Sequence, residues 1–133
     1  MFLTRLILEA DDQPGVWIVS AALDWRPLNG RLRGCDDVVV PPGTLTDLAS
    51  VPRVLRNVPF LDTTGRSRRG AVLHDFLYRG GVFRCGRRPT RGEADRILFR
   101  ALRADGCSRW VAGVFYAGVR VGGWAAWVTI RSS

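Results

Sequence analysis

Residues 73–78 have the sequence Leu-His-Asp-Phe-Leu-Tyr, and this stretch is expected to organise the fold. It contains the only histidine of the chain, His74, followed directly by Asp75. On a helix, His74 and Tyr78 lie one turn apart on the same face. Asp75 and Arg79 share the neighbouring face, while the leucine and phenylalanine side chains contact the core. The pattern therefore predicts a tightly packed helix that carries polar groups into or beside the core.

Polar groups in such a position need hydrogen-bond partners, because an unpaired buried polar group is costly. The sequence offers two carboxylates for this role, Asp47 in the segment T-D-L-A-S and Asp95 in the segment R-G-E-A-D. We predict that both converge on His74 and Asp75 in space.

Length and composition favour one globular domain over residues 1–133. A chain of 133 residues is long enough for a real hydrophobic core. An apolar content of 47% with a charged content of 24% excludes an intrinsically disordered chain. We expect a strand-rich part over residues 1–50, a helical part over residues 53–123 and a short, extended C-terminal tail.

The charge is unevenly distributed along this basic chain. All 20 basic residues are arginines. Residues 1–66 hold 7 arginines and 8 acids, a net charge of −1, whereas residues 67–133 hold 13 arginines and 4 acids, a net charge of +9. A basic half can bind phosphates or dock on an acidic protein partner. No recognised nucleic-acid-binding module accompanies it, so nucleic acid is one possible partner among others.

The cysteines and the N-terminus indicate where the protein is made. Cys35, Cys85 and Cys107 are odd in number and lack C-x-x-C spacing, which indicates neither a disulfide framework nor a zinc site. Arg5 and Glu9 interrupt what would have to be the apolar core of a signal peptide. We therefore expect synthesis in a reducing cytoplasm.

The first third of the chain has the pattern of strands. Residues 2–9 and 16–25 are apolar and are separated by D-D-Q-P-G, a turn signal, which predicts an antiparallel hairpin. Residues 37–40 predict a short strand that the following Pro-Pro-Gly ends. Beyond it, Asp47 and Ser50 are suited to capping a short helix after Pro52.

The rest of the chain has helical signals. Helices are expected at residues 68–79, 91–104 and 109–122, with Ser67 and Ser108 as N-caps of the first and last. A capping box starts the middle helix, with Thr90 and Glu93 as its members. The predicted fold class is α+β, with a small N-terminal antiparallel sheet of three or four strands packed against about three helices.

The segment from Trp110 to Ile130 contains a single charge, Arg120, so a membrane span has to be considered. Arg120 would lie mid-span at a cost of about 2.5–3.5 kcal/mol, and four glycines lower the apolarity further. A core helix packed through small residues is favoured, and no membrane span is expected. Trp124 and Trp127, after a glycine pair, are expected to form a closing strand or an exposed aromatic patch that contacts a partner.

Four segments in order resemble a family of small proteins from tailed-phage and prophage genomes, the domain-of-unknown-function family 1353. They are V-P-P-G-T-L-T-D-L-A-S-V-P, A-V-L-H-D-F-L-Y-R, R-G-E-A-D-R-I-L-F-R-A-L and Y-A-G-V-R-V-G-G, between residues 38 and 123. The resemblance implies a phage or prophage source and supplies no activity. The positions that match the family pattern are Asp47, Ser50, Pro52, His74, Asp75, Tyr78, Asp95, Tyr116 and Arg120.

Two classes of function fit these residues. The first is an accessory virion component of a tail, baseplate or neck, without a cofactor, which is made in the host cytoplasm and assembles with other phage proteins. Its polar residues would form a structural network of Asp47, Ser50, His74, Asp75, Tyr78, Asp95 and Arg120.

The second class is a metal-dependent hydrolase. A site of Asp47, His74, Asp75 and Asp95 has the oxygen-rich ligand set that suits Mg²⁺ or Mn²⁺, and the ion would lower the pKa of bound water. Without a metal, His74 could act as an acid or base that Asp75 or Asp47 orients. The sequence leaves open whether the protein is an enzyme.

Overall fold

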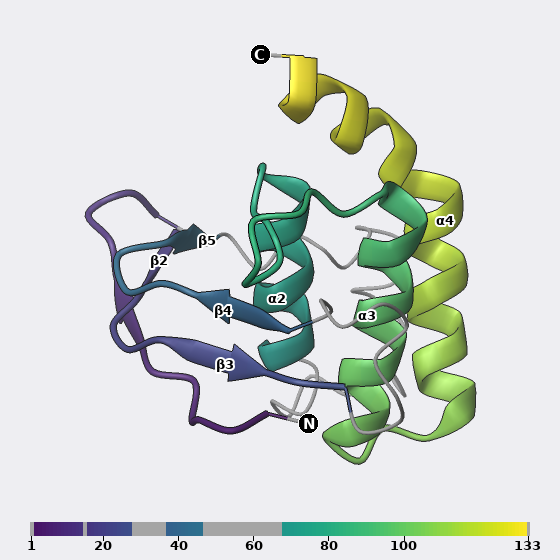
Figure 1. Cartoon of the computed structure of the whole chain (residues 1–133), viewed down its shortest axis with the longest axis horizontal. Helices are drawn as coiled ribbons and strands as arrows, with labels where there is room; N and C mark the ends of the chain where they lie inside the picture. The colour runs from purple at the N-terminus through teal and green to yellow at the C-terminus, as the bar shows by residue number, and fades with distance from the viewer. Residues whose placement is uncertain (1, 15, 28–36, 47–67, 133) are drawn as a thin grey trace.

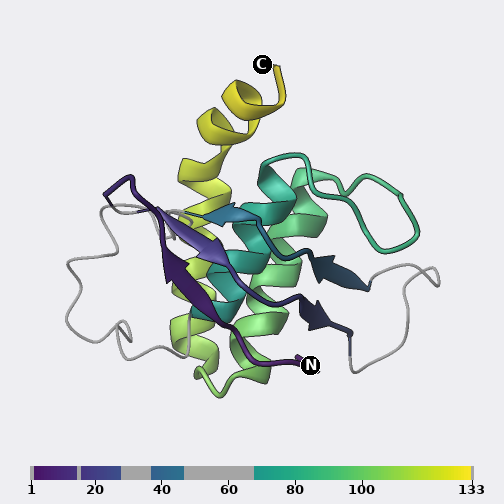
Figure 2. The ribbon, with the colours of Figure 1, turned by 90° about the vertical axis from the view of Figure 1, so that its left-hand side faces the viewer.

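The computed structural model describes residues 2–14, 16–27, 37–46 and 68–132. It contains an N-terminal strand region followed by a helical region, so the predicted α+β fold class is confirmed (Figure 1). The strands lie over one side of α2, and the other two helices lie behind it (Figure 2). The short helix expected after Pro52 and the caps Asp47, Ser50 and Ser67 lie outside the described residues.

The strands form two small antiparallel sheets. One sheet has the order β1-β2-β5 and the other pairs β3 with β4. Their bounds are Leu8–Ala10 for β1, Trp17–Val19 for β2, Leu23–Trp25 for β3, Val38–Val40 for β4 and Leu45–Thr46 for β5.

The predicted hairpin exists, with Leu8 opposite Val19 and Ala10 opposite Trp17. The expectation of one sheet was wrong for the described residues, because the apolar run over residues 16–25 divides between the two sheets. After β2, the backbone N–H of Ser20 still bonds to the first sheet, through the carbonyl of Ile7 at 2.9 Å. The strand β3 that follows pairs instead with β4, and β4 ends before Pro41 as predicted.

The helices begin close to the predicted positions. Their bounds are Arg68–Tyr78 for α2, Arg91–Ala104 for α3 and Arg109–Ser132 for α4. The capping box of Thr90 and Glu93 is confirmed. Ser108 caps α4, since its hydroxyl accepts the N–H of Val111 at 3.2 Å. Gly106 follows the C-cap of α3 with a φ of +92°, a conformation that favours glycine.

The C-terminal tail was expected to be extended after residue 123, and this prediction was wrong: α4 continues to Ser132. The side chain of Trp127 packs against the main core, and its ring meets the Tyr78 ring edge-on with centroids 5.1 Å apart. This tertiary contact outweighs the low helix propensity of the two glycines that precede it. In Figures 1 and 2 the last turns of α4 project beyond α2 and α3.

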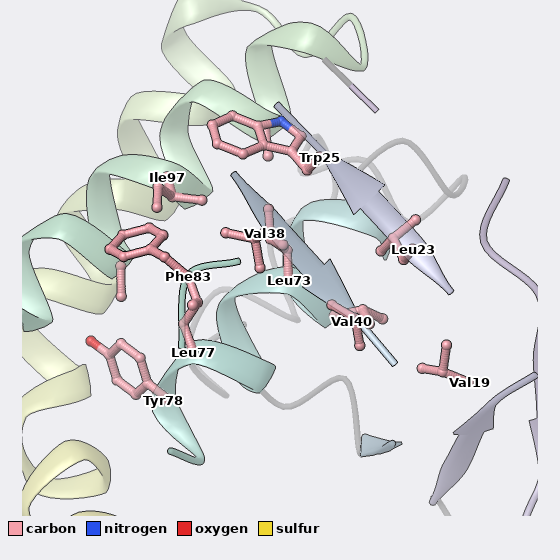
Figure 3. Close-up of a cluster of buried hydrophobic side chains, with 13 residues drawn as sticks. Val19, Leu23, Trp25, Val38, Val40, Leu73, Leu77, Tyr78, Phe83 and Ile97 are labelled. Atoms are coloured by element: carbon pink, nitrogen blue, oxygen red, sulfur yellow. The ribbon is translucent and has the colours of Figure 1, made fainter. Parts of the chain in front are cut away.

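The main hydrophobic core lies between the strands and α2, as Figure 3 shows. Inward-facing strand residues meet Leu73 and Leu77 of the L-H-D-F-L-Y stretch, so this stretch does supply the core contact. A second cluster joins α3 to α4 and consists of Leu98, Leu102, Cys107, Ala112, Phe115 and Val119. Both clusters hold α2, α3 and α4 together around the polar residues described below.

The structure bears on two expectations from the sequence, one about the cysteines and one about a membrane span. Cys85 is disulfide-bonded, although the cysteine pattern did not indicate a disulfide; an odd count still leaves room for one bridge. Cys107 is free and buried. In the described part of the chain, no helix has the length and apolarity needed to cross a membrane.

Candidate functional site

Asp95 lies at the centre of the polar residues, with its side chain completely buried. It follows Ala94, a member of the apolar stripe of α3, and therefore lies at the edge of that stripe. The sequence left open whether Asp95 faces solvent or the core. The structure places it between three helices, where an ionised carboxylate needs several donors to be stable.

Three side chains from two other helices donate to this carboxylate. The Nε2 atom of His74 lies 2.8 Å from Oδ1 of Asp95, and the Tyr78 hydroxyl donates to the same oxygen at 2.6 Å. The Arg120 guanidinium donates to Oδ2 at 3.0 Å. His74 and Tyr78 come from α2 and Arg120 from α4. We call these four residues the Asp95 cluster.

The Asp95 cluster shifts the titration of its members. Burial by itself raises the pKa of Asp95, but hydrogen bonds from His74, Tyr78 and Arg120 outweigh it, and the pKa lies below its ordinary value. Burial raises the pKa of Tyr78, and the neighbouring Asp95 charge raises it further. The carboxylate is therefore ionised and the phenol neutral at neutral pH. Nε2 of His74 must carry a proton, because an ionised carboxylate only accepts.

Two further features fix the cluster, and neither could be recognised in the sequence. Arg91, the first residue of α3, donates to the backbone carbonyl of Val119 at 3.1 Å and to that of Arg120. Gly123 lies against Tyr78, since a Cβ atom at this glycine would be 2.7 Å from the Tyr78 hydroxyl. Helical periodicity gives no signal for either contact, because both depend on how α4 crosses α2 and α3.

Asp75, the other acid of the L-H-D-F-L-Y stretch, faces Arg79 on the neighbouring side of α2. The Nε atom of Arg79 donates to Oδ1 of Asp75 at 3.0 Å. The structure therefore brings together four of the predicted network residues around Asp95 and places Asp75 beside them. Asp47 and Ser50 lie outside the described residues, so their predicted convergence with His74 stays a prediction.

The arrangement limits the chemistry of the described residues. Among residues 2–14, 16–27, 37–46 and 68–132, no group of three or more His, Cys, Asp or Glu side chains is placed to hold a metal ion. Both oxygens of Asp95 accept hydrogen bonds. The Nδ1 atom of His74 is buried without a hydrogen-bond partner in this part of the chain. Asp95 and His74 thus form a dyad whose second ring nitrogen has no hydrogen-bond partner among the described residues.

Sequence comparison places these residues in a family. No curated protein and no solved structure matches the chain at a significant level. A family match covers residues 27–119, which include α2, α3, the Asp95 cluster except Arg120, and the first half of α4. Because this match spans more than half of the sequence, the chain belongs to the family described as Protein of unknown function (DUF1353).

Proposed function

We propose that the protein is a small, non-catalytic accessory component of a phage virion, in a tail, baseplate or neck. The observation that carries the proposal is the use of the Asp95 carboxylate, whose two oxygens are occupied by three donors from α2 and α4. A buried carboxylate that accepts three hydrogen bonds joins three helices and leaves only about one of its four lone-pair sites for a substrate. The motif resemblance to phage and prophage proteins supports the virion as the location.

The proposed protein would be made in the host cytoplasm and would then assemble with other phage proteins. The basic half of the chain supports docking, because it carries most of the arginines. Mass spectrometry of purified particles tests this proposal. We expect peptides of this chain in particles, at a constant ratio to a known structural protein. Its absence from particles, together with its presence in infected cells, would refute the virion assignment.

A second candidate is a metal-dependent hydrolase, and the Nδ1 atom of His74, which has no partner in the described part of the chain, is the observation that favours it. An ion would have to bind Nδ1, because Nε2 faces Asp95. Asp95 would then orient the imidazole from behind, as carboxylates commonly do for metal-binding histidines. Asp47 and Asp75 are the remaining proposed ligands, and their oxygens suit Mg²⁺ or Mn²⁺.

Thermal unfolding with added Mg²⁺ or Mn²⁺ separates the two candidates. A virion component with a structural cluster should have the same melting temperature with and without the ions. A metal site should give a rise that grows with ion concentration, because the ion binds only the folded state. His74→Ala would abolish that rise. Tyr78→Phe is the matched control, since it perturbs the Asp95 cluster and leaves the imidazole in place.

A further inference from the structure

The outward face of α4 is apolar from Trp110 to Val128, although it faces solvent. Trp110, Val121, Trp124 and Val128 are 67%, 86%, 62% and 44% exposed, and Ala117 is exposed between them. Their positions are seven, four, three and four residues apart, so they lie along one side of the helix. We call these five residues the α4 stripe. Solvent-facing helix surfaces are normally polar, so a continuous stripe of this kind indicates a binding surface.

A row of positive charge lies beside the α4 stripe. Phe99 of α3 packs edge-on against Tyr116 of α4, with ring centroids 6.1 Å apart, and this contact marks the outer seam between the two helices. Arginines of both helices lie within one or two turns of these rings, on the same or the neighbouring face. They are Arg96, Arg100, Arg103, Arg109 and Arg120.

Acidic side chains do not neutralise this row within the described residues. Arg120 is exposed too but forms an ion pair with Asp95, while the other four arginines are exposed and form no ion pair there. The acids of α3 and its C-cap are already engaged, Glu93 by Arg87 and Asp105 by Arg69. The α4 sequence itself contains no acid. The surface therefore combines exposed hydrocarbon, two exposed indoles and uncompensated positive charge.

We propose that this surface binds the headgroup region of an anionic lipid bilayer, with the α4 stripe in the interface and the arginine row on the lipid phosphates. Tryptophan favours the membrane–water interface, and basic residues near an anionic leaflet add electrostatic attraction. The helix lies at the edge of the molecule and its end projects (Figure 1), so its outer face can approach a surface.

Other occupants fit the same residues less well. A second copy of the chain would bring two arginine rows together without acids to pair them, in a protein of net charge +8. Single-stranded nucleic acid would find phosphate contacts, but the aliphatic middle of the stripe, Ala117 and Val121, offers bases no ring to stack on. A bilayer supplies hydrocarbon and negative charge along the same line. This inference does not depend on the virion assignment.

Vesicle co-sedimentation of the full chain tests the proposal. Vesicles of phosphatidylglycerol and phosphatidylcholine in equal parts should pellet the protein and shift its tryptophan fluorescence to shorter wavelength, while pure phosphatidylcholine should bind it far less. Val121→Glu should weaken binding at least about tenfold, because it removes apolar area and adds a negative charge at the interface. Val121 is 86% exposed, more than any other large apolar residue that the structure describes, so the fold should tolerate the change.

The matched control is Leu45→Glu, which makes the same change in charge at an exposed position of β5, away from α4 (Figure 1). This variant should bind vesicles within about twofold of the parent chain. If both variants lost vesicle binding to the same extent, the loss would be due to net charge alone. The α4 stripe would then have no role in binding. Absence of binding to anionic vesicles would overturn the proposal. It would also be overturned if the chain formed a dimer in the absence of vesicles and Val121→Glu dissociated that dimer.

Discussion

Two carboxylates on α3, only two residues apart, show how differently one chemical group can be used in this protein. Asp95 is completely buried and accepts from α2 and α4. Glu93 is partly exposed and accepts from Arg87 at 2.8 and 3.1 Å and from the backbone N–H of Thr90 at 3.2 Å. The pKa of each lies below its ordinary value. The direction of a pKa shift therefore does not reveal how much of the fold depends on the group.

The difference lies in what remains when the carboxylate is removed. Without Glu93, Arg87 is hydrated and the helix loses half of its capping box. Without Asp95, an imidazole N–H and a phenol are left in a nearly dry interior, and the exposed guanidinium of Arg120 loses its carboxylate partner. The cost of breaking a buried charged network is several times that of a surface pair. The predictions below test this contrast, from the largest expected effect to the smallest.

Asp95→Ala should lower the free energy of unfolding by about 3–5 kcal/mol, because it leaves two buried donors, His74 and Tyr78, without an acceptor and removes the charge that pairs with Arg120. Urea denaturation followed by circular dichroism measures the change. Asp95→Asn keeps the shape and isolates the loss of charge. A loss below about 1 kcal/mol for Asp95→Ala would mean that water replaces the carboxylate, and the contrast with Glu93 would disappear.

Tyr78→Phe should cost about 1.5–3 kcal/mol at neutral pH, since it removes a hydrogen bond to a charged group. The raised pKa of Tyr78 also predicts a pH dependence. The phenol ionises near pH 10 in the unfolded chain but only at higher pH in the folded one. Stability should therefore fall as the pH rises above about 10.

This alkaline loss should be absent from Tyr78→Phe. The chain has no lysine to titrate in the same range. The difference between the two curves of unfolding free energy against pH thus gives the contribution of Tyr78, because the two proteins share all other titratable groups. Parallel curves for the two proteins above pH 10 would show that Tyr78 is not held neutral by its surroundings.

Part of this cluster could be predicted from the sequence, because local spacing determines it. His74 and Tyr78 are four residues apart, so any helix aligns them, and the same holds for Asp75 and Arg79. Asp95 was less certain, since it lies at the edge of an apolar stripe where periodicity favours neither burial nor exposure. Its burial is decided by α2 and α4, which approach from distant parts of the sequence.

The end of α4 and the division of the strands were predicted wrongly for a related reason. Gly122 and Gly123 are identical in propensity, and both argue against a continuing helix. The structure separates them: Gly122 has open space around it, whereas Gly123 lets α4 approach Tyr78. Likewise, the apolar run over residues 16–25 predicts extended chain but does not show where the chain changes sheets.

The two glycines provide a matched pair of variants. Gly123→Ala should cost about 1–3 kcal/mol, because its Cβ would overlap the Tyr78 hydroxyl and displace it from Asp95. Gly122→Ala should instead stabilise the protein by about 0.5–1 kcal/mol through helix propensity. Urea midpoints of the two variants should move in opposite directions. A shift in the same direction would show that the Tyr78 contact does not constrain α4.

Glu93→Ala should have the smallest effect, about 1 kcal/mol, because it removes half of a capping box and one surface ion pair. High salt should reduce the ion-pair part, since the pair is partly exposed, but should change the cost of Asp95→Ala little. Acid should weaken both sites. A lowered folded pKa gives stability that is present above the unfolded value, about 4, and is lost as the pH falls through the folded value.

The contrast with Asp95 is therefore sharpest when salt and pH are varied together. Between pH 7 and 5 both carboxylates stay ionised, and the cost of Glu93→Ala should fall on addition of 1 M salt, where the Debye length is about 3 Å. Arg87→Ala should lose the same salt-dependent contribution to the free energy of unfolding as Glu93→Ala. The double variant should lose no more of this contribution than either single variant. If Asp95→Ala showed equal salt sensitivity, its carboxylate would be reached by solvent ions. The distinction between a buried and a surface carboxylate on α3 would then fail.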